Sequence, residues 1–175
     1  MIPGDPEQDL GDPVEVARQI CLSQLEARPR TRAELAQTLS KRGVPPEPAD
    51  EVLDRLTAVG LIDDKAFAEL WVRARHRERG LARAALRQEL HRKGVDPQVA
   101  DAALGEVDEV DELATARRLV ERKLVATRGL PTETRIRRLV SLLARKGYSS
   151  ATAFAVVRVA LREQEQLELA EEASL

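Results

Sequence analysis

The segment RAELAQTLSKRGV at residues 32–44 returns as RAALRQELHRKGV at residues 83–95. The two copies align without a gap at an offset of 51 residues (83 − 32), and identical residues continue as far as Leu53 and Leu104. A fainter third copy, RRLVSLLARKGY at residues 137–148, follows a further 53 residues along the chain (147 − 94). Self-similarity at a period of about fifty residues predicts tandem copies of one helical unit.

Each copy carries local signals for helices, and they are clearest in the first copy. Thr31 and Glu34 have the spacing of a capping box, which predicts that a helix begins there, and Gly43 can supply the left-handed residue that ends it. The Pro45-Pro46 pair stands where proline is tolerated, in the first turn of the next helix. That helix has apolar residues at i, i+3, i+4 and i+7, namely Ala49, Val52, Leu53 and Leu56.

The other helices follow from the same kind of spacing. A helix over residues 14–27 is expected to open the first unit. In the second unit, Asp63 or Asp64 is expected to cap a helix with an apolar face of Phe67, Leu70, Trp71 and Ala74. The third unit offers a helix over residues 113–126 and then two apolar faces: Ile136, Leu139, Val140 and Leu143, and Ala153, Val156, Val157, Ala160 and Leu161. No segment alternates with period two, so we predict an all-α fold of three tandem three-helix repeat units in an elongated, curved arrangement.

These patterns also divide the chain. We expect a flexible acidic N-terminus at residues 1–13, repeat units at residues 14–62, 63–107 and 112–162, and an acidic C-terminal tail at residues 163–175. The polar segment GEVDEVDE at residues 105–112 is expected to be a hinge before the third unit. The tail has few apolar residues after Arg162, so we expect it to be dispensable for folding.

The composition favours packed helices in a cytoplasmic protein. Hydrophobic residues make up 43% of the 175 residues and are mostly Ala, Leu and Val, whereas aromatic residues make up 2%. Helices accept such a composition better than a β-sandwich does. No apolar run is long enough to span a membrane, and the acidic first residues do not resemble a signal peptide. The single cysteine, Cys21, excludes an internal disulfide, so we expect a buried, inert thiol. We also expect a soluble monomer.

Charge is segregated along the chain, although the net charge is only −2. Residues 73–93 carry eight Lys and Arg against two acids, and residues 117–146 carry ten against two. Residues 1–15, 96–112 and 163–175 carry five, seven and five acids and no Lys or Arg. Such blocks indicate a surface that meets a charged partner, with solvated helix faces as the plainer alternative.

The sequence offers no constellation that suggests an enzyme, a cofactor site or a metal site. Asp63 and Asp64 fit a helix cap better than a metal site or an acid–base pair, because they stand at a helix start. Trp71 lies four residues from Phe67 on an apolar face, which favours a core position over a base-stacking one. No Cys/His set accompanies the two histidines, and neither a phosphate-binding glycine loop nor a catalytic triad is visible.

The arginines are the polar residues that most strongly suggest a partner. Arg73/Arg77, Arg75/Arg79 and Arg83/Arg87 are like-charged i, i+4 pairs, each of which destabilises a helix by about 0.2–0.5 kcal/mol unless an anion offsets it. We expect that anion to be an acidic protein surface, with the DNA backbone as a secondary contact, because the chain has few aromatic rings for stacking on bases. The expected partner-binding residues are Arg73, Arg75, Arg77, Arg79, Arg83, Arg87, Arg92, Lys93, Arg135, Arg138, Arg145 and Lys146.

Three segments resemble the RecX regulatory proteins. The most specific is GLIDDKAFA at residues 60–68, followed by Trp71, Val72 and Arg73. The others are LEARPRTRAEL at residues 25–35 and Gln88-Glu89-Leu90 with Lys93-Gly94-Val95, and the resemblance covers roughly residues 14–161. It implies tandem three-helix units that bind filaments of the RecA recombinase in DNA repair, homologous recombination and the SOS response. It also implies that such a protein modulates, usually inhibits, the ATPase, strand-exchange and co-protease activities of RecA.

Two other functions stay open at this point. Short helices in groups of three can imitate helix-turn-helix units, so a sequence-tolerant nucleic-acid-binding protein is the main alternative. A helical adaptor for an unrelated partner is the other. The sequence alone does not decide between inhibition and stimulation of RecA.

Overall fold

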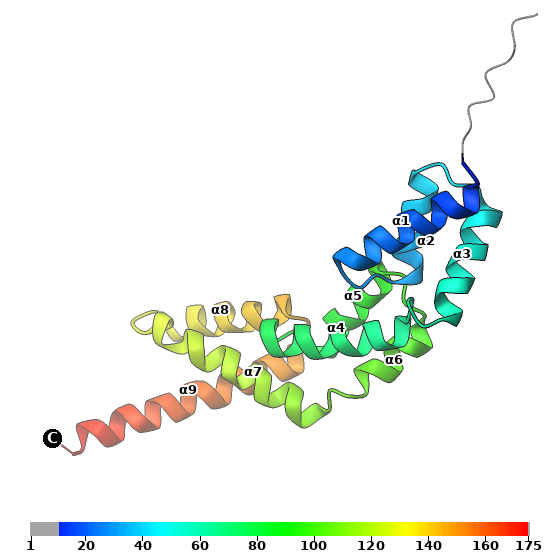
Figure 1. Ribbon diagram of the computed structural model, residues 1–175. Helices are drawn as coiled ribbons and strands as arrows, with labels where there is room; N and C mark the ends of the chain where they lie inside the picture. Colours follow the sequence, from blue (N-terminus) through cyan, green and yellow to red (C-terminus); the bar gives the residue numbers. More distant parts are fainter. Residues whose placement is uncertain (1–10, 175) are drawn as a thin grey trace, which may run out of the picture. The chain divides into compact units, whose positions relative to one another are not determined.

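The computed structural model describes residues 11–174, which form nine α-helices and one short 3-10 helix with no strand among them (Figure 1). The helices are α1 (Pro13–Ala27), α2 (Arg32–Lys41), α3 (Pro46–Ala58), α4 (Asp64–Arg79), α5 (Arg83–Arg92), α6 (Pro97–Leu104), α7 (Glu109–Leu124), η1 (Val125–Thr127), α8 (Thr132–Arg145) and α9 (Ser150–Glu172). The predicted all-α class is confirmed, and the flexible segment expected over residues 1–13 lies almost wholly outside the described residues.

The chain forms two compact units. One holds the chain through Ala68 together with Leu90–Val99, and the other holds Glu69–Glu89 together with the chain from Ala100 onward. The three unit boundaries expected from the sequence repeat stay a prediction, because the two compact units do not follow the repeat.

In the first compact unit, helices α1, α2 and α3 pack on one another around an aliphatic core. The four residues predicted for the face of α3 are all buried, and so is Cys21, whose pKa is raised by burial. Thr31 and Glu34 form the predicted capping box: the Glu34 N–H donates to Thr31 Oγ1 at 3.1 Å, and the Thr31 N–H donates to Glu34 Oε2 at 3.1 Å. Gly43 follows α2 with the predicted positive φ.

In the second compact unit, α7, α8 and α9 pack on one another. Their core contains Leu139, Leu143, Ala153, Val157, Ala160 and Leu161, as the sequence predicts, and also Val120 and Tyr148. The Tyr148 hydroxyl donates a buried 3.0 Å hydrogen bond to the Gly80 carbonyl oxygen. Burial raises the pKa of this phenol, so it stays protonated as a donor.

The predicted apolar face of α4 is wrong in part. Leu70 is 55% exposed and Trp71 is half-buried, because α4 buries Phe67, Ala68 and Val72 instead. Helix α4 carries apolar residues on more than one side, so spacing alone could not select the buried side.

The helix ends also differ from the sequence expectations. Helix α7 begins at Glu109, so half of the expected 105–112 hinge is helical, and Val107 before it is buried. Helix α9 continues to Glu172, which makes most of the expected tail helical. Gln164 in that extension is buried, and its side-chain oxygen accepts a 2.5 Å hydrogen bond from Arg135. Apolar spacing therefore could not predict that the helix continues past this residue, because glutamine is polar.

The start of one helix contacts the end of another in the same way at two places, between α2 and α5 and between α5 and α8. We call this the repeat contact. In the first compact unit, Thr31 Oγ1 donates to the Lys93 carbonyl oxygen at 2.6 Å. In the second, the Ala82 N–H donates to the Lys146 carbonyl oxygen at 2.9 Å. Positions 31 and 82 differ by the 51-residue offset of the sequence repeat (82 − 31). The repeat in the sequence is therefore also a repeat in how the end of one helix meets the start of another.

Carboxylates also cap the starts of α2 and α5. The Arg32 N–H at the start of α2 donates to Asp64 Oδ1 at 2.9 Å, and the Arg83 N–H at the start of α5 donates to Glu112 Oε1 at 2.6 Å. In each case the acid lies near the start of the helix two further along the chain, α4 or α7, and satisfies a free backbone donor. The cap role expected for the Asp63-Asp64 pair is confirmed, since Asp63 Oδ1 accepts from the Ala66 N–H at 2.9 Å.

A candidate basic binding surface

Six of the twelve residues expected to bind a partner are engaged within the chain. Two of them are exposed arginines in ion pairs with acids of the 96–112 block: Arg73 lies 3.1 Å from Glu106, and Arg87 lies 3.0 Å from Asp101. Both pairs are solvent-exposed, so each stabilises the fold only slightly and leaves its arginine accessible. The segregated charges of the sequence therefore neutralise one another in part.

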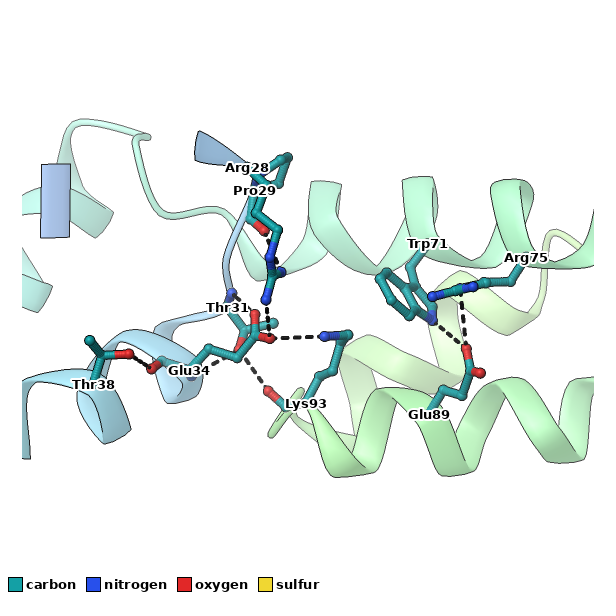
Figure 2. A network of polar contacts seen from close by, with 9 residues as sticks. All are labelled: Arg28, Pro29, Thr31, Glu34, Thr38, Trp71, Arg75, Glu89 and Lys93. Carbon is teal, nitrogen blue, oxygen red and sulfur yellow. Dashed lines mark hydrogen bonds and ion pairs between the residues drawn. The ribbon is translucent and has the colours of Figure 1, made fainter. Parts of the chain in front are cut away.

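Arg75 is half-buried, although the i, i+4 spacing predicts a solvent-facing side chain. Figure 2 shows its guanidinium over the ring of Trp71, 4.3 Å from the ring centroid. Glu89 joins the two residues: its carboxylate accepts from Trp71 Nε1 at 2.8 Å and lies 3.6 Å from Arg75. The one tryptophan ring is therefore already covered by a cation, which leaves it poorly placed to stack on a nucleic-acid base.

Lys93 is also engaged, at the first repeat contact. Its Nζ lies 2.8 Å from Glu34 Oε1, and both side chains are largely buried (Figure 2). Burial alone would raise the pKa of Glu34, but hydrogen bonds from Lys93 and from the Thr31 N–H outweigh it and lower the pKa below the usual value. The pair is thus a structural link between α2 and the end of α5.

Arg135 and Lys146 hold elements of the second compact unit together. Arg135 donates to Thr127 Oγ1 at 3.3 Å and to Gln164, while Lys146 Nζ donates to the Arg79 carbonyl oxygen at 2.7 Å. Arg83 is half-buried, and its Nε is buried without a hydrogen-bond partner in the described chain.

The remaining five residues form the accessible part of the predicted set. Their side chains are exposed and have no ion pair or side-chain hydrogen bond within residues 11–174; they are Arg77, Arg79, Arg92, Arg138 and Arg145. These are the cations that a partner could neutralise without breaking a contact of the fold.

Two of them line a pocket that the sequence did not reveal. Arg77 and Arg79 at the end of α4 face Arg118 and Arg122 of α7, with Lys146 also in the lining, around a cavity of about 300 Å³. Arg118 and Arg122 are missing from the predicted set. Their spacing with Thr115 and Leu119 (i, i+3, i+4 and i+7 from position 115) was the signal that could have found them, because it places all four on one side of α7.

The described residues show neither a metal centre nor a membrane span. No group of three or more His, Cys, Asp or Glu side chains in residues 11–174 is placed to hold a metal ion. Within the same range, no helix combines the length and the apolar character that a bilayer crossing requires. His76 bridges the Leu81 carbonyl oxygen, at 2.9 Å, and Thr115 Oγ1, at 3.1 Å, which gives it a structural role.

Solved structures are similar to this chain in fold. The crystal structure of RecX from Lactobacillus salivarius superposes with a TM-score of 0.78 over 86% of this chain and 98% of that chain, at 21% sequence identity. A crystal structure of a regulatory protein RecX superposes with a TM-score of 0.72 over 81% of this chain and 70% of that chain, at 26% identity.

Sequence comparisons give the family. The models of the first, second and third three-helix domains of RecX match residues 17–56, 63–104 and 109–157. The regulatory protein RecX of Streptomyces coelicolor is 54% identical over 92% of this chain and 84% of its own length. The regulatory protein RecX of Thermobifida fusca is 52% identical over 81% of this chain and 77% of its own length. That of Mycolicibacterium smegmatis is 46% identical over 93% of this chain and 89% of its own length. The chain belongs to the RecX family of regulatory proteins.

Proposed function

We propose that this protein binds filaments of the RecA recombinase and inhibits their ATPase, strand-exchange and co-protease activities. It acts in the cytoplasm as a monomer without catalysis of its own, in DNA repair, homologous recombination and the SOS response. Family membership supports a regulatory role, and the resemblance to RecX proteins supports RecA as the partner. The observation that carries the proposal is a set of exposed arginines whose side chains make no ion pair or hydrogen bond in the described chain: Arg77, Arg79, Arg92, Arg138 and Arg145.

Unpaired arginines favour a protein partner with an acidic surface. Each exposed charge adds little affinity alone, but complementary charges steer association and fix its orientation. Arg77 and Arg79 belong to the first basic block, and Arg138 and Arg145 to the second. Two basic sites on one chain can contact neighbouring protomers of a filament, and their contributions then combine through effective concentration.

The aromatic residues argue against a primary role in binding single-stranded DNA. Such proteins usually stack bases on exposed rings. Phe67 and Tyr148 are buried, Trp71 is covered by Arg75, and only Phe154, at 42% exposure, presents a ring to solvent in the described chain. DNA phosphates are therefore a secondary contact in this proposal.

Co-sedimentation tests the proposal directly. The full chain would be centrifuged with RecA filaments formed on single-stranded DNA, and in parallel with the same DNA alone. The proposal predicts that the protein enters the pellet only when RecA is present. Sedimentation with DNA alone, with affinity that falls steeply as salt rises, would support the nucleic-acid-binding alternative instead.

A further inference from the structure

The basic pocket at the end of α4 has an unusual balance of charge. Its lining contains five cationic side chains, those of Arg77, Arg79, Arg118, Arg122 and Lys146, and one acid, Glu78. The lining therefore carries a formal charge of +4 (five cations less one acid). Like charges gathered in a concave site repel one another, so an anion bound within it would stabilise the arrangement.

Most of these cationic side chains have N–H donors that make no hydrogen bond within the described chain. Arg118 uses Nη2 to donate to Thr115 Oγ1 at 2.8 Å, and Lys146 donates to the Arg79 carbonyl oxygen. The guanidinium groups of Arg77, Arg79 and Arg122 have no hydrogen-bond acceptor or ion pair in the part of the chain that the structure describes. A guanidinium has five N–H donors in a planar fork that matches the oxygens of phosphate groups.

The walls of the pocket are fixed by contacts around Gly80. Tyr148 donates to the Gly80 carbonyl oxygen, Lys146 binds the residue before it, and the repeat contact joins Ala82 to the Lys146 carbonyl oxygen. Gly80 itself has a positive φ of 64°, and a Cβ there would come within 2.9 Å of Leu119 on α7. A site that is held in place before its ligand arrives binds with a smaller loss of conformational entropy.

We propose that this pocket binds a compact polyanion with two or more adjacent phosphate groups. The volume of about 300 Å³ lies at the small end of the range for ligand sites. One phosphate monoester carries a charge of about −1.5 to −2 near neutral pH. A single group would therefore leave much of the +4 lining unneutralised, whereas linked phosphates would match it. The phosphates could come from a free oligophosphate, such as a nucleoside triphosphate, or from consecutive positions of a nucleic-acid backbone.

The inference goes beyond the proposed function and is tested without RecA. Isothermal titration calorimetry of the full chain with sodium tripolyphosphate is expected to show saturable binding at one site. The variant Arg77→Gln/Arg122→Gln removes one cation from each wall and is expected to weaken binding by roughly tenfold or more, because each guanidinium lost takes away charge-assisted hydrogen bonds to the phosphate oxygens. Arg158→Gln/Arg162→Gln on α9 is the matched control, because both arginines are exposed and lie outside the pocket. Circular dichroism would verify that both variants fold.

Competition separates the two sources of phosphate. An oligothymidylate that displaces tripolyphosphate from wild type, but binds the pocket variant weakly, would assign the site to nucleic-acid phosphates. Tripolyphosphate binding that oligothymidylate leaves unchanged would assign it to a free oligophosphate. The proposal is overturned if tripolyphosphate does not bind, or if the pocket variant and the α9 control lose affinity equally.

Discussion

The hydroxyl of Thr31 donates a 2.6 Å hydrogen bond to the carbonyl oxygen of Lys93, 62 residues further along the chain. The same hydroxyl accepts from the Glu34 N–H, so one side chain both caps α2 and fastens the end of α5 to it. Ala82 takes the equivalent position in the next repeat and makes the contact with its backbone N–H. The repeat contact is thus kept while the donating group changes.

Replacing Thr31 tests how much this hydroxyl stabilises the fold. Thr31→Val keeps the shape of the side chain but removes the cap and the donor to Lys93, so we expect a loss of about 1–2 kcal/mol in the free energy of unfolding. Thr57→Val is the control, because the Thr57 hydroxyl donates only to the Leu53 carbonyl oxygen of its own helix. Urea denaturation would compare the two. Equal losses would show that Thr31 contributes nothing beyond a local bond.

Comparing alanine substitutions at Gly94 and Gly43 distinguishes the cost of a strained backbone from the cost of close packing. Both follow a helix with positive φ, 71° and 77°, but a Cβ at Gly94 would overlap Ala33 Cβ, whereas nothing lies within 4 Å of one at Gly43. Gly43→Ala should therefore cost about 1–2 kcal/mol for the left-handed backbone alone. Gly94→Ala should cost about 1–3 kcal/mol more, because it also overpacks the repeat contact. Similar melting temperatures for the two variants would contradict the close approach at Gly94.

Acid should weaken the contact between Glu34 and Lys93. The pKa of Glu34 is lowered in the folded protein from an ordinary value of 4.5. Its carboxylate therefore contributes stability that is present above that value and is lost as the pH falls through the folded-state pKa. Glu34→Gln should flatten the loss of stability between roughly pH 5 and pH 3, whereas Glu26→Gln, at an exposed position on α1, should leave it unchanged. Identical pH profiles for wild type and Glu34→Gln would contradict this role.

The extension of α9 predicts where the chain can be shortened. A chain ending at Arg162 loses Gln164 and leaves Arg135 without one of its acceptors, so it should be less stable by about 1–3 kcal/mol. A chain ending at Leu169 keeps Gln164 and its 2.7 Å bond to Glu168 and removes only exposed residues among those described. It should melt like the full chain. If the shorter chain does so as well, the burial of Gln164 does not matter for stability.

The fold was largely predictable because the repeat carries redundant local signals. Thr31 with Glu34, the Pro45-Pro46 pair and Gly43 each mark a helix end by short-range chemistry, and the structure has all of these ends. Spacing could not choose the buried side of α4, since its apolar residues surround the helix. An apolar pattern cannot locate the end of α9, because the buried residue there is Gln164, a polar side chain that hydrogen-bonds to Arg135.

The candidate site was less predictable than the fold. Net charge along the sequence identified the basic blocks, but it could not show that Arg75 covers Trp71 or that Lys93 pairs with Glu34. Nor could it bring Arg77 of α4 to the same pocket as Arg122 of α7. Such pairings depend on contacts between residues far apart in the chain, which a single sequence does not encode in any local pattern.

The structure also shows which arginines are suitable for testing the proposed binding to RecA. Arg87 and Arg135 are engaged in the fold, so charge reversal there would confuse binding with stability. Arg138 and Arg145 are exposed without partners in the described chain, and Arg158 and Arg162 on α9 match them outside both basic blocks. The pairs Arg138→Glu/Arg145→Glu and Arg158→Glu/Arg162→Glu therefore change charge equally.

The most direct test of the proposed function is the ATPase rate of RecA on single-stranded DNA, titrated with wild type and with these two variants. Wild type should lower the rate in a saturable way, and Arg158→Glu/Arg162→Glu should do the same. Arg138→Glu/Arg145→Glu should need roughly tenfold more protein for the same effect, because reversed charges repel an acidic partner as well as losing attraction. If wild type leaves the ATPase rate unchanged at every concentration, this protein does not inhibit RecA.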